Sequence, residues 1–285
     1  MSGAALALVL GSAVLHASWN LLAKRAKGGV EFLWLFALLT IAVYGPVAVI
    51  YFVLVRPELT WQHIGLALVS SAIHVGYFIC LQRGYRAGDL SLVYPLARGS
   101  GPALATVLAI LLLAERPGEL ALLGTVLVVF SVFILSGGRT ILDPKQRTAV
   151  LYGLATGAFI ATYTVWDGLS VGHLGAAPVL FTFTGEVGRA ALLAPVALKR
   201  SAVVADVWRT HRWEALGVAV LSPLAYIMVL TAMQFTPVSL VAPTREISIL
   251  IGTLLGTRLL HEGDGRRRLV GAALMVGGVV LLATS

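Results

Sequence analysis

Two arginines and one glutamate lie inside long apolar runs of the sequence, just after prolines. Arg98 follows Pro95 by three residues, and Arg245 and Glu246 follow Pro243 by two and three. Ionisable side chains within apolar spans are costly, which makes these residues candidates for function. A proline near a helix start leaves backbone groups unpaired and can act as a break or gate, and a guanidinium can hold a carboxylate or phosphate. The pattern predicts an anion-binding site; alternatively, each arginine pairs with a glutamate and joins two helices.

Other polar residues in the apolar runs extend this set of candidates. Tyr94 lies four residues before Arg98, which predicts that both side chains share one helix face and one binding site. Glu186 and Arg189 are three residues apart, a spacing that favours an intrahelical ion pair with a structural role.

Aromatic and hydrogen-bonding residues recur at spacings of three and four, which is typical of the wall of a cavity for a small polar molecule. The candidates are His16, Trp19, Asn20, His74, Tyr77, Tyr163, Trp166 and Tyr226. Aromatic residues can also anchor helices at the membrane interface, and polar ones can join helices. The histidines could relay protons, but helix packing is the favoured interpretation. Asp167 lies near the expected membrane end of its run.

The residue spacings give no indication of a metal site or a cofactor. They also contain no nucleophile with a matching base, so an enzyme is not expected.

The composition indicates a membrane protein. Hydrophobic residues make up 58% and charged residues 12% of the 285 positions, and the mean hydropathy is +0.91. Soluble proteins have about 25% charged residues. The net charge is +8, but the basic residues lie in short breaks between apolar runs, which argues against a nucleic-acid partner. The single cysteine, Cys80, carries no disulfide signal.

The apolar runs predict ten transmembrane helices, because about 20 apolar residues of helix cross a bilayer. The predicted spans are 4–23, 31–55, 62–82, 90–113, 118–137, 149–169, 177–198, 214–234, 238–260 and 269–284. The runs lack the alternation of barrel strands, which predicts an all-α integral membrane protein.

The basic residues predict an orientation, because cytoplasmic loops carry an excess of lysine and arginine. Of the 21 such residues, 16 fall in loops on one side of the predicted spans and 2 on the side that holds both termini. Both termini are therefore predicted to lie outside the cytoplasm.

The sequence also contains an internal repeat. SLVYP at 91–95 returns as SLVAP at 239–243, and GPVAV at 45–49 returns as APVAL at 194–198. Offsets near 148 relate the two halves, 1–140 and 141–285, as five-helix units. An odd number of spans in each unit predicts that the halves insert in opposite senses, which is common in transporters. The alternative is that duplication only enlarged a membrane scaffold.

These features resemble the drug/metabolite transporter superfamily and its EamA-type members. The resemblance rests on the ten spans, on the ASWN at 17–20, on both proline motifs and on LLLAERP at 111–117. It implies a carrier in the bacterial cytoplasmic membrane, often an exporter, of small metabolites such as amino acids. The resemblance implies termini in the cytoplasm, as is usual in this family, whereas the loop charge count predicts termini outside it.

The first span carries no acid, unlike that of the superfamily's small multidrug members, so lipophilic cations are disfavoured. A substrate with a carboxylate or phosphonate is favoured, and in an amino acid the amine would lie near Glu246. Protons are a candidate coupling ion, and a monomer or weak homodimer is expected. The alternatives are an importer or exchanger of sugars or nucleotide-linked metabolites, and a non-transporting membrane sensor.

Overall fold

The computed structural model describes residues 1–26, 29–88, 90–136, 144–251 and 265–285, and these ranges contain helices but no β-strand. The first half forms α1 (Gly3–Ala26), α2 (Val30–Val55), α3 (Trp61–Ala87), α4 (Leu90–Leu112) and α5 (Glu119–Ser136). The second half begins with the short 3-10 helix η1 (Pro144–Gln146). It continues with α6 (Arg147–Gly172), α7 (Pro178–Lys199), α8 (Ser201–Met233), α9 (Val238–Thr244) and α11 (Gly265–Thr284). The predicted all-α class is confirmed.

Seven of these helices, α1 to α4 and α6 to α8, are long and apolar enough to cross a membrane. In addition, α5 and α11 contain shorter apolar segments, Glu119–Leu135 and Leu269–Thr284. Large apolar side chains lie on the outside of the bundle, including Leu54 at 76% and Leu111 at 71% exposure. Such a surface is stable against lipid and not against water, so the chain is an integral membrane protein.

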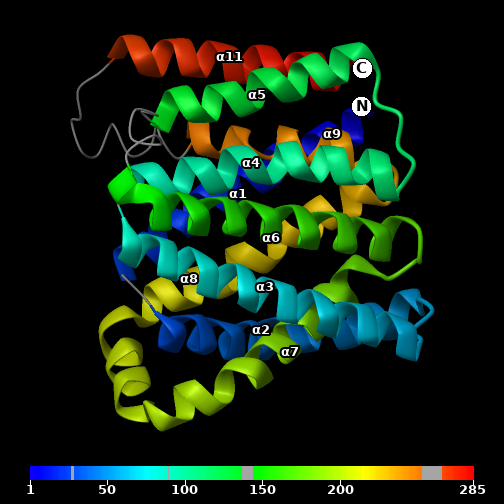
Figure 1. Cartoon of the computed structure of the whole chain (residues 1–285). Coiled ribbons are helices and arrows are strands. Elements are labelled where there is room, and N and C mark those ends of the chain that lie inside the picture. The colour runs from blue at the N-terminus through cyan, green and yellow to red at the C-terminus, as the bar shows by residue number, and fades with distance from the viewer. Residues whose placement is uncertain (27–28, 89, 137–143, 252–264) are drawn as a thin grey trace.

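The helix α8 differs most from its prediction, because it begins at Ser201 instead of residue 214. Its first three turns carry basic residues that lower the local hydropathy, so the sequence suggested a connector. They are nevertheless helical, and Val204 and Val207 pack against a buried cluster that contains Phe32 and Val218. The backbone bends at His211, where φ is −132° and ψ is 26°. Figure 1 shows the first turns of α8 turning aside from the rest of that helix.

The predicted span 238–260 is not one continuous helix. The α9 helix ends at Thr244, residues 245–246 form a turn, and helix resumes at residue 247. Pro243 lies two residues before this turn, in which the Glu246 N–H donates to the Pro243 carbonyl oxygen at 3.0 Å, three residues back instead of four. The backbone of α4, in contrast, stays helical through Pro95. Residues 252–260 of the predicted span lie outside the described residues.

The helices lie side by side in one bundle, with α5 and α11 at one edge and α2 and α7 at the other (Figure 1). Helices of the two halves pack in matching pairs: α1 contacts α8 as α6 contacts α3, and α2 contacts α8 as α7 contacts α3. Both termini lie on the same side, where the Met1 ammonium donates to the Ala283 carbonyl oxygen at 3.1 Å.

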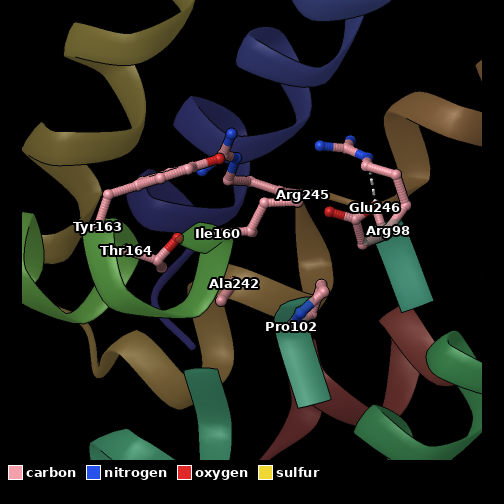
Figure 2. Close-up of a pocket in the computed structure, with 8 residues that line it drawn as sticks. All are labelled: Arg98, Pro102, Ile160, Tyr163, Thr164, Ala242, Arg245 and Glu246. Atoms are coloured by element: carbon pink, nitrogen blue, oxygen red, sulfur yellow. Dashed lines mark ion pairs between the residues drawn. The ribbon is translucent and has the colours of Figure 1, made fainter. Parts of the chain in front are cut away.

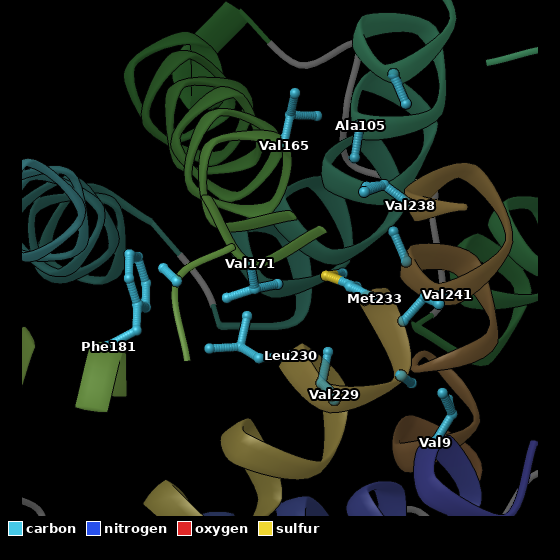
Figure 3. Packing of buried hydrophobic residues seen from close by; sticks show 14 of the residues in the cluster. Val9, Ala105, Val165, Val171, Phe181, Val229, Leu230, Met233, Val238 and Val241 are labelled. Carbon is cyan, nitrogen blue, oxygen red and sulfur yellow. The ribbon is translucent and has the colours of Figure 1, made fainter. Parts of the chain in front are cut away.

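Small residues and a central apolar cluster hold the middle of the bundle together. A Cβ atom at Gly157 of α6 would lie 2.0 Å from the Ser100 Oγ of α4, so these two backbones approach closely. Figure 3 shows the cluster in which Val9, Val165 and Leu230 pack, from α1, α6 and α8. These contacts fix α1, α4, α6, α8 and α9 around the polar residues described next.

Candidate functional site

A small polar cavity lies where α4, α6 and the break after α9 meet (Figure 2). Its lining consists of Arg98, Pro102, Ile160, Tyr163, Thr164, Ala242, Arg245 and Glu246. The cavity volume is about 10 Å³, and a single water needs about 10–15 Å³. The site is therefore closed in this conformation to any molecule larger than about one water.

Arg98 and Glu246 form an ion pair between α4 and the turn after α9. The Arg98 Nε lies 3.1 Å from the Glu246 Oε2, and both side chains are buried. The Arg98 Nη2 also donates to the Ser248 Oγ at 3.3 Å. Arg98 thus has the helix-joining contact that was the alternative interpretation of its sequence position.

Arg245 differs from Arg98, because its side chain has no ion pair or hydrogen bond within the part of the chain that the structure describes. It is half-buried, and its guanidinium lies beside the Tyr163 ring in Figure 2. A cation that faces a closed polar cavity without a counterion can bind an anionic group.

Aromatic rings from α3, α6 and α8 form a wall next to this cavity. His74 stacks on Tyr163 with ring centroids 4.1 Å apart, and it meets Tyr226 edge-on at 5.7 Å. Tyr77 meets Tyr163 edge-on at 5.9 Å. The Tyr226 hydroxyl donates to the Asp167 Oδ2. Four of the sequence candidates therefore gather in one cluster with Asp167.

The candidates on α1 form a separate group. His16 and Trp19 meet edge-on with centroids 4.8 Å apart, and the Asn20 Nδ2 donates to the His16 carbonyl oxygen at 2.7 Å. The Trp19 Nε1 is buried without a hydrogen-bond partner among the described residues. The Trp19 indole N–H is therefore an unused donor that a ligand could bind.

Three further candidates have structural contacts or lie beside the site. The Trp166 Nε1 donates to the Leu66 carbonyl oxygen at 3.0 Å, which ties α6 to α3. Arg189 and Glu186 form an ion pair of 2.8 Å on α7, as their spacing predicts. Tyr94 is half-buried within electrostatic range of Arg98.

Sequence reasoning missed the role of Glu115, in the loop after α4. Its Oε1 accepts from the Val238 N–H at 2.7 Å, and its Oε2 accepts from the Ser239 N–H at 2.9 Å. These are the first two N–H groups of α9, which have no partner within the helix. Ala114 has φ of 54° in this loop. The LLLAERP motif marked the segment, but nothing in it indicated a partner 123 residues away.

The comparisons with known proteins agree with this architecture. A model of the EamA-like transporter family matches residues 147–284. A relative from Escherichia fergusonii, a probable 4-amino-4-deoxy-L-arabinose-phosphoundecaprenol flippase subunit ArnE, is 31% identical over 108 residues. The match covers 37% of this chain and 90% of that protein. A crystal structure of another protein, 18% identical, superposes with a TM-score of 0.77 over 100% of this chain and 98% of that one, which shows a shared fold.

Proposed function

The chain belongs to the EamA-like transporter family, and we propose from this premise that it carries small metabolites with a carboxylate or a similar anionic group across the bacterial inner membrane. The observation that carries the proposal is Arg245, a cation at the central cavity whose side chain forms no ion pair with any described residue. Glu246 already neutralises Arg98. An anionic substrate would therefore bring the charge of the site to zero, and a buried charge gains most from such a partner.

The neighbouring rings suit the remainder of such a substrate. Tyr163, which stacks on His74, offers an aromatic ring at the cavity wall, and Thr164 offers a hydroxyl there. An amino acid fits this set if its carboxylate binds Arg245 and its amine approaches Glu246. The absence of an acid in α1 disfavours lipophilic cations.

We infer that transport proceeds by alternating access between two inverted five-helix halves, 1–140 and 141–285. The matching helix pairs support the repeat, because each pair joins one helix of the first half to one of the second. The closed cavity supports a cycle in which the site opens to one side at a time. Export is the proposed direction, with both termini outside the cytoplasm.

The test is a thermal-shift screen of the purified protein, because a ligand that binds only the folded state raises its melting temperature. The panel contains amino acids, dicarboxylates, phosphonates and sugar phosphates, with tetraphenylphosphonium as the lipophilic cation. We expect anionic or zwitterionic compounds to stabilise the protein, and tetraphenylphosphonium to have no effect.

Arg245→Ala should weaken binding of the most stabilising compound by about 10- to 100-fold, since hydrogen bonds to charged groups contribute about 1.5–3 kcal/mol. Arg209→Ala is the control, because Arg209 is exposed on the first turns of α8. Undiminished affinity in Arg245→Ala would contradict the proposal. Binding without counterflow in liposomes would instead favour a sensor.

A lipid-linked sugar phosphate is a second candidate substrate. The relative from Escherichia fergusonii is named as a subunit of a flippase for a sugar attached to phosphoundecaprenol, and the match covers most of its length. A phosphate would be as good a partner for Arg245 as a carboxylate. Stabilisation by polyprenyl phosphates, but not by soluble amino acids or sugar phosphates, would favour this candidate.

A further inference from the structure

Asp167 is a buried acid that forms no ion pair with a described residue and does not line the central cavity. It lies on α6 with 0% exposure, and the Tyr226 hydroxyl donates to its Oδ2. Its Oδ1 has no hydrogen-bond partner, and its carboxyl group has no ion pair, within the described residues. An ionised carboxylate left without a cation in such surroundings costs several kcal/mol.

The groups around Asp167 come from its own helix, α6, and from α3, α7, α8 and the turn after α9. Ser70 faces it from α3, Tyr226 from α8 and Tyr163 from one turn earlier on α6, and His74 of α3 lies against the Tyr226 ring. Two cations act on Asp167 at longer range, Arg189 of α7 and Arg245 after α9.

Neither cation neutralises the carboxyl group. The Arg189 guanidinium is paired with Glu186, with its Nη1 atom 2.8 Å from the Glu186 Oε1. Arg245 lines the cavity and forms no ion pair with Asp167. Since no cation in the described bundle offsets a negative charge at Asp167, a bound proton is the remaining way to neutralise it.

A chain of ring contacts connects Asp167 to the cavity. The Tyr226 hydroxyl bonds to Asp167, its ring meets His74, and His74 stacks on the cavity residue Tyr163. Tyr163 is also four residues before Asp167 on the same helix face. A charge change at Asp167 therefore acts directly on the rings that close the substrate site.

We propose that Asp167 is a proton-binding site whose occupancy holds the transporter closed, an inference that rests on the proposed transport function. In the closed conformation the carboxyl group is neutral, with Tyr226 as its hydrogen-bond donor. When α3, α6 and α8 part, water reaches the group, its O–H bond breaks and the proton passes to water. The carboxylate left behind is charged, and its burial without a counterion opposes reclosure until it is protonated again.

The first test detects the proton itself and needs no substrate. Infrared spectra of the purified protein should contain a carbonyl band of a protonated carboxyl group that is lost in Asp167→Asn. Glu186→Gln is the matched control, because Glu186 is another buried acid but has Arg189 as its partner; the band should persist in it. A wild-type spectrum without this band, or a band unchanged in Asp167→Asn, would overturn the proposal.

The second test measures opening. Thr164, a buried cavity residue, is replaced by cysteine in a Cys80→Ser background, with and without Asp167→Asn. The labelling rate by a maleimide should rise more steeply with pH when Asp167 is present, and the Asp167→Asn protein corrects for the pH dependence of the thiol. Equal pH profiles of the labelling rate with and without Asp167→Asn would contradict the proposed effect of Asp167 on opening. Both readouts are independent of the substrate, so a failed ligand screen would not affect them.

Discussion

At the scale of single residues, the two central arginines have the same chemistry but different surroundings. Arg98 is held by Glu246 and Ser248 and thereby connects α4 with the turn after α9. Arg245, one residue before Glu246, has no such partner among the described residues. Removing Arg98 would therefore leave a buried glutamate without its partner, whereas removing Arg245 would leave no ion pair broken.

Glu115 illustrates how one side chain can stabilise a short helix. It accepts hydrogen bonds from two N–H groups at the start of α9, and a negative charge there also interacts favourably with the helix dipole. Glu115→Ala should lower the free energy of unfolding by about 1–2 kcal/mol. Thermal unfolding of the purified protein measures the effect.

The control for that substitution is Glu119→Ala, which removes an exposed acid from the first turn of α5. Only its interaction with the helix dipole is lost, so the expected decrease is below about 1 kcal/mol. Equal decreases in the two variants would show that the contact with α9 adds no stability.

The sequence indicated which polar residues line the cavity better than it indicated which residues they contact. Arg98, Arg245 and Tyr163 stood out because polar groups in apolar runs are rare, and all three line the cavity. The pairing of Glu115 with α9, and the covering of Asp167 by α3 and α8, depend on contacts between distant segments. Periodicity within one helix contains no information on such contacts.

At the scale of elements, α5 and α11 approach each other through two glycines. A Cβ atom at Gly278 would lie 2.8 Å from the Gly124 carbonyl oxygen, and one at Gly124 would lie 2.8 Å from the Gly278 carbonyl oxygen. Both obstacles are backbone atoms, which cannot rotate away. These two helices can pack at this distance only because neither position has a side chain.

Gly278→Ala should therefore destabilise the protein by about 1–3 kcal/mol through overpacking, even though alanine favours helix. The control is Gly277→Ala on the same helix, where a Cβ atom would meet nothing within 4 Å. That variant should be unchanged or up to about 1 kcal/mol more stable. Melting temperatures of the two variants in the same detergent make the comparison, and a stable Gly278→Ala protein would contradict the close approach.

The sequence predicted element positions where hydropathy is strong and missed them where it is diluted. The predicted ranges for α1, α2 and α6 agree with the observed bounds to within about three residues. The start of α8 was missed because its first turns combine basic residues with valines that pack on only one side. The proline at 243 drew attention to α9, but a proline in the sequence does not determine whether a helix breaks, since α4 continues through Pro95.

At the scale of the whole molecule, the distribution of basic residues predicts the orientation in the membrane. Both termini lie on one side of the bundle, away from the bend between α7 and the first turns of α8 (Figure 1). That bend carries Lys199, Arg200 and Arg209. The 16 to 2 division of loop charges predicts that this basic side faces the cytoplasm.

Cysteine labelling of intact cells tests the orientation, because Cys80 is the single cysteine and can be replaced by serine. In that background Ser285→Cys should react with a membrane-impermeant maleimide added to whole cells. Thr210→Cys, at an exposed position on the basic side, should react only after the cells are lysed. The reverse labelling pattern would show that the termini lie in the cytoplasm, which is the orientation that the family resemblance implies.

The small volume of the central cavity also matters to the cell that carries this protein. A space of about 10 Å³ holds at most about one water molecule, so no continuous file of water can pass through this cavity while its lining residues stay in these positions. A carrier whose central site stays this narrow between transport events would not discharge the electrical potential of the membrane through that site. Insulation of this kind is what separates a carrier from an open pore, and here it depends on side chains that meet in the middle of the bundle.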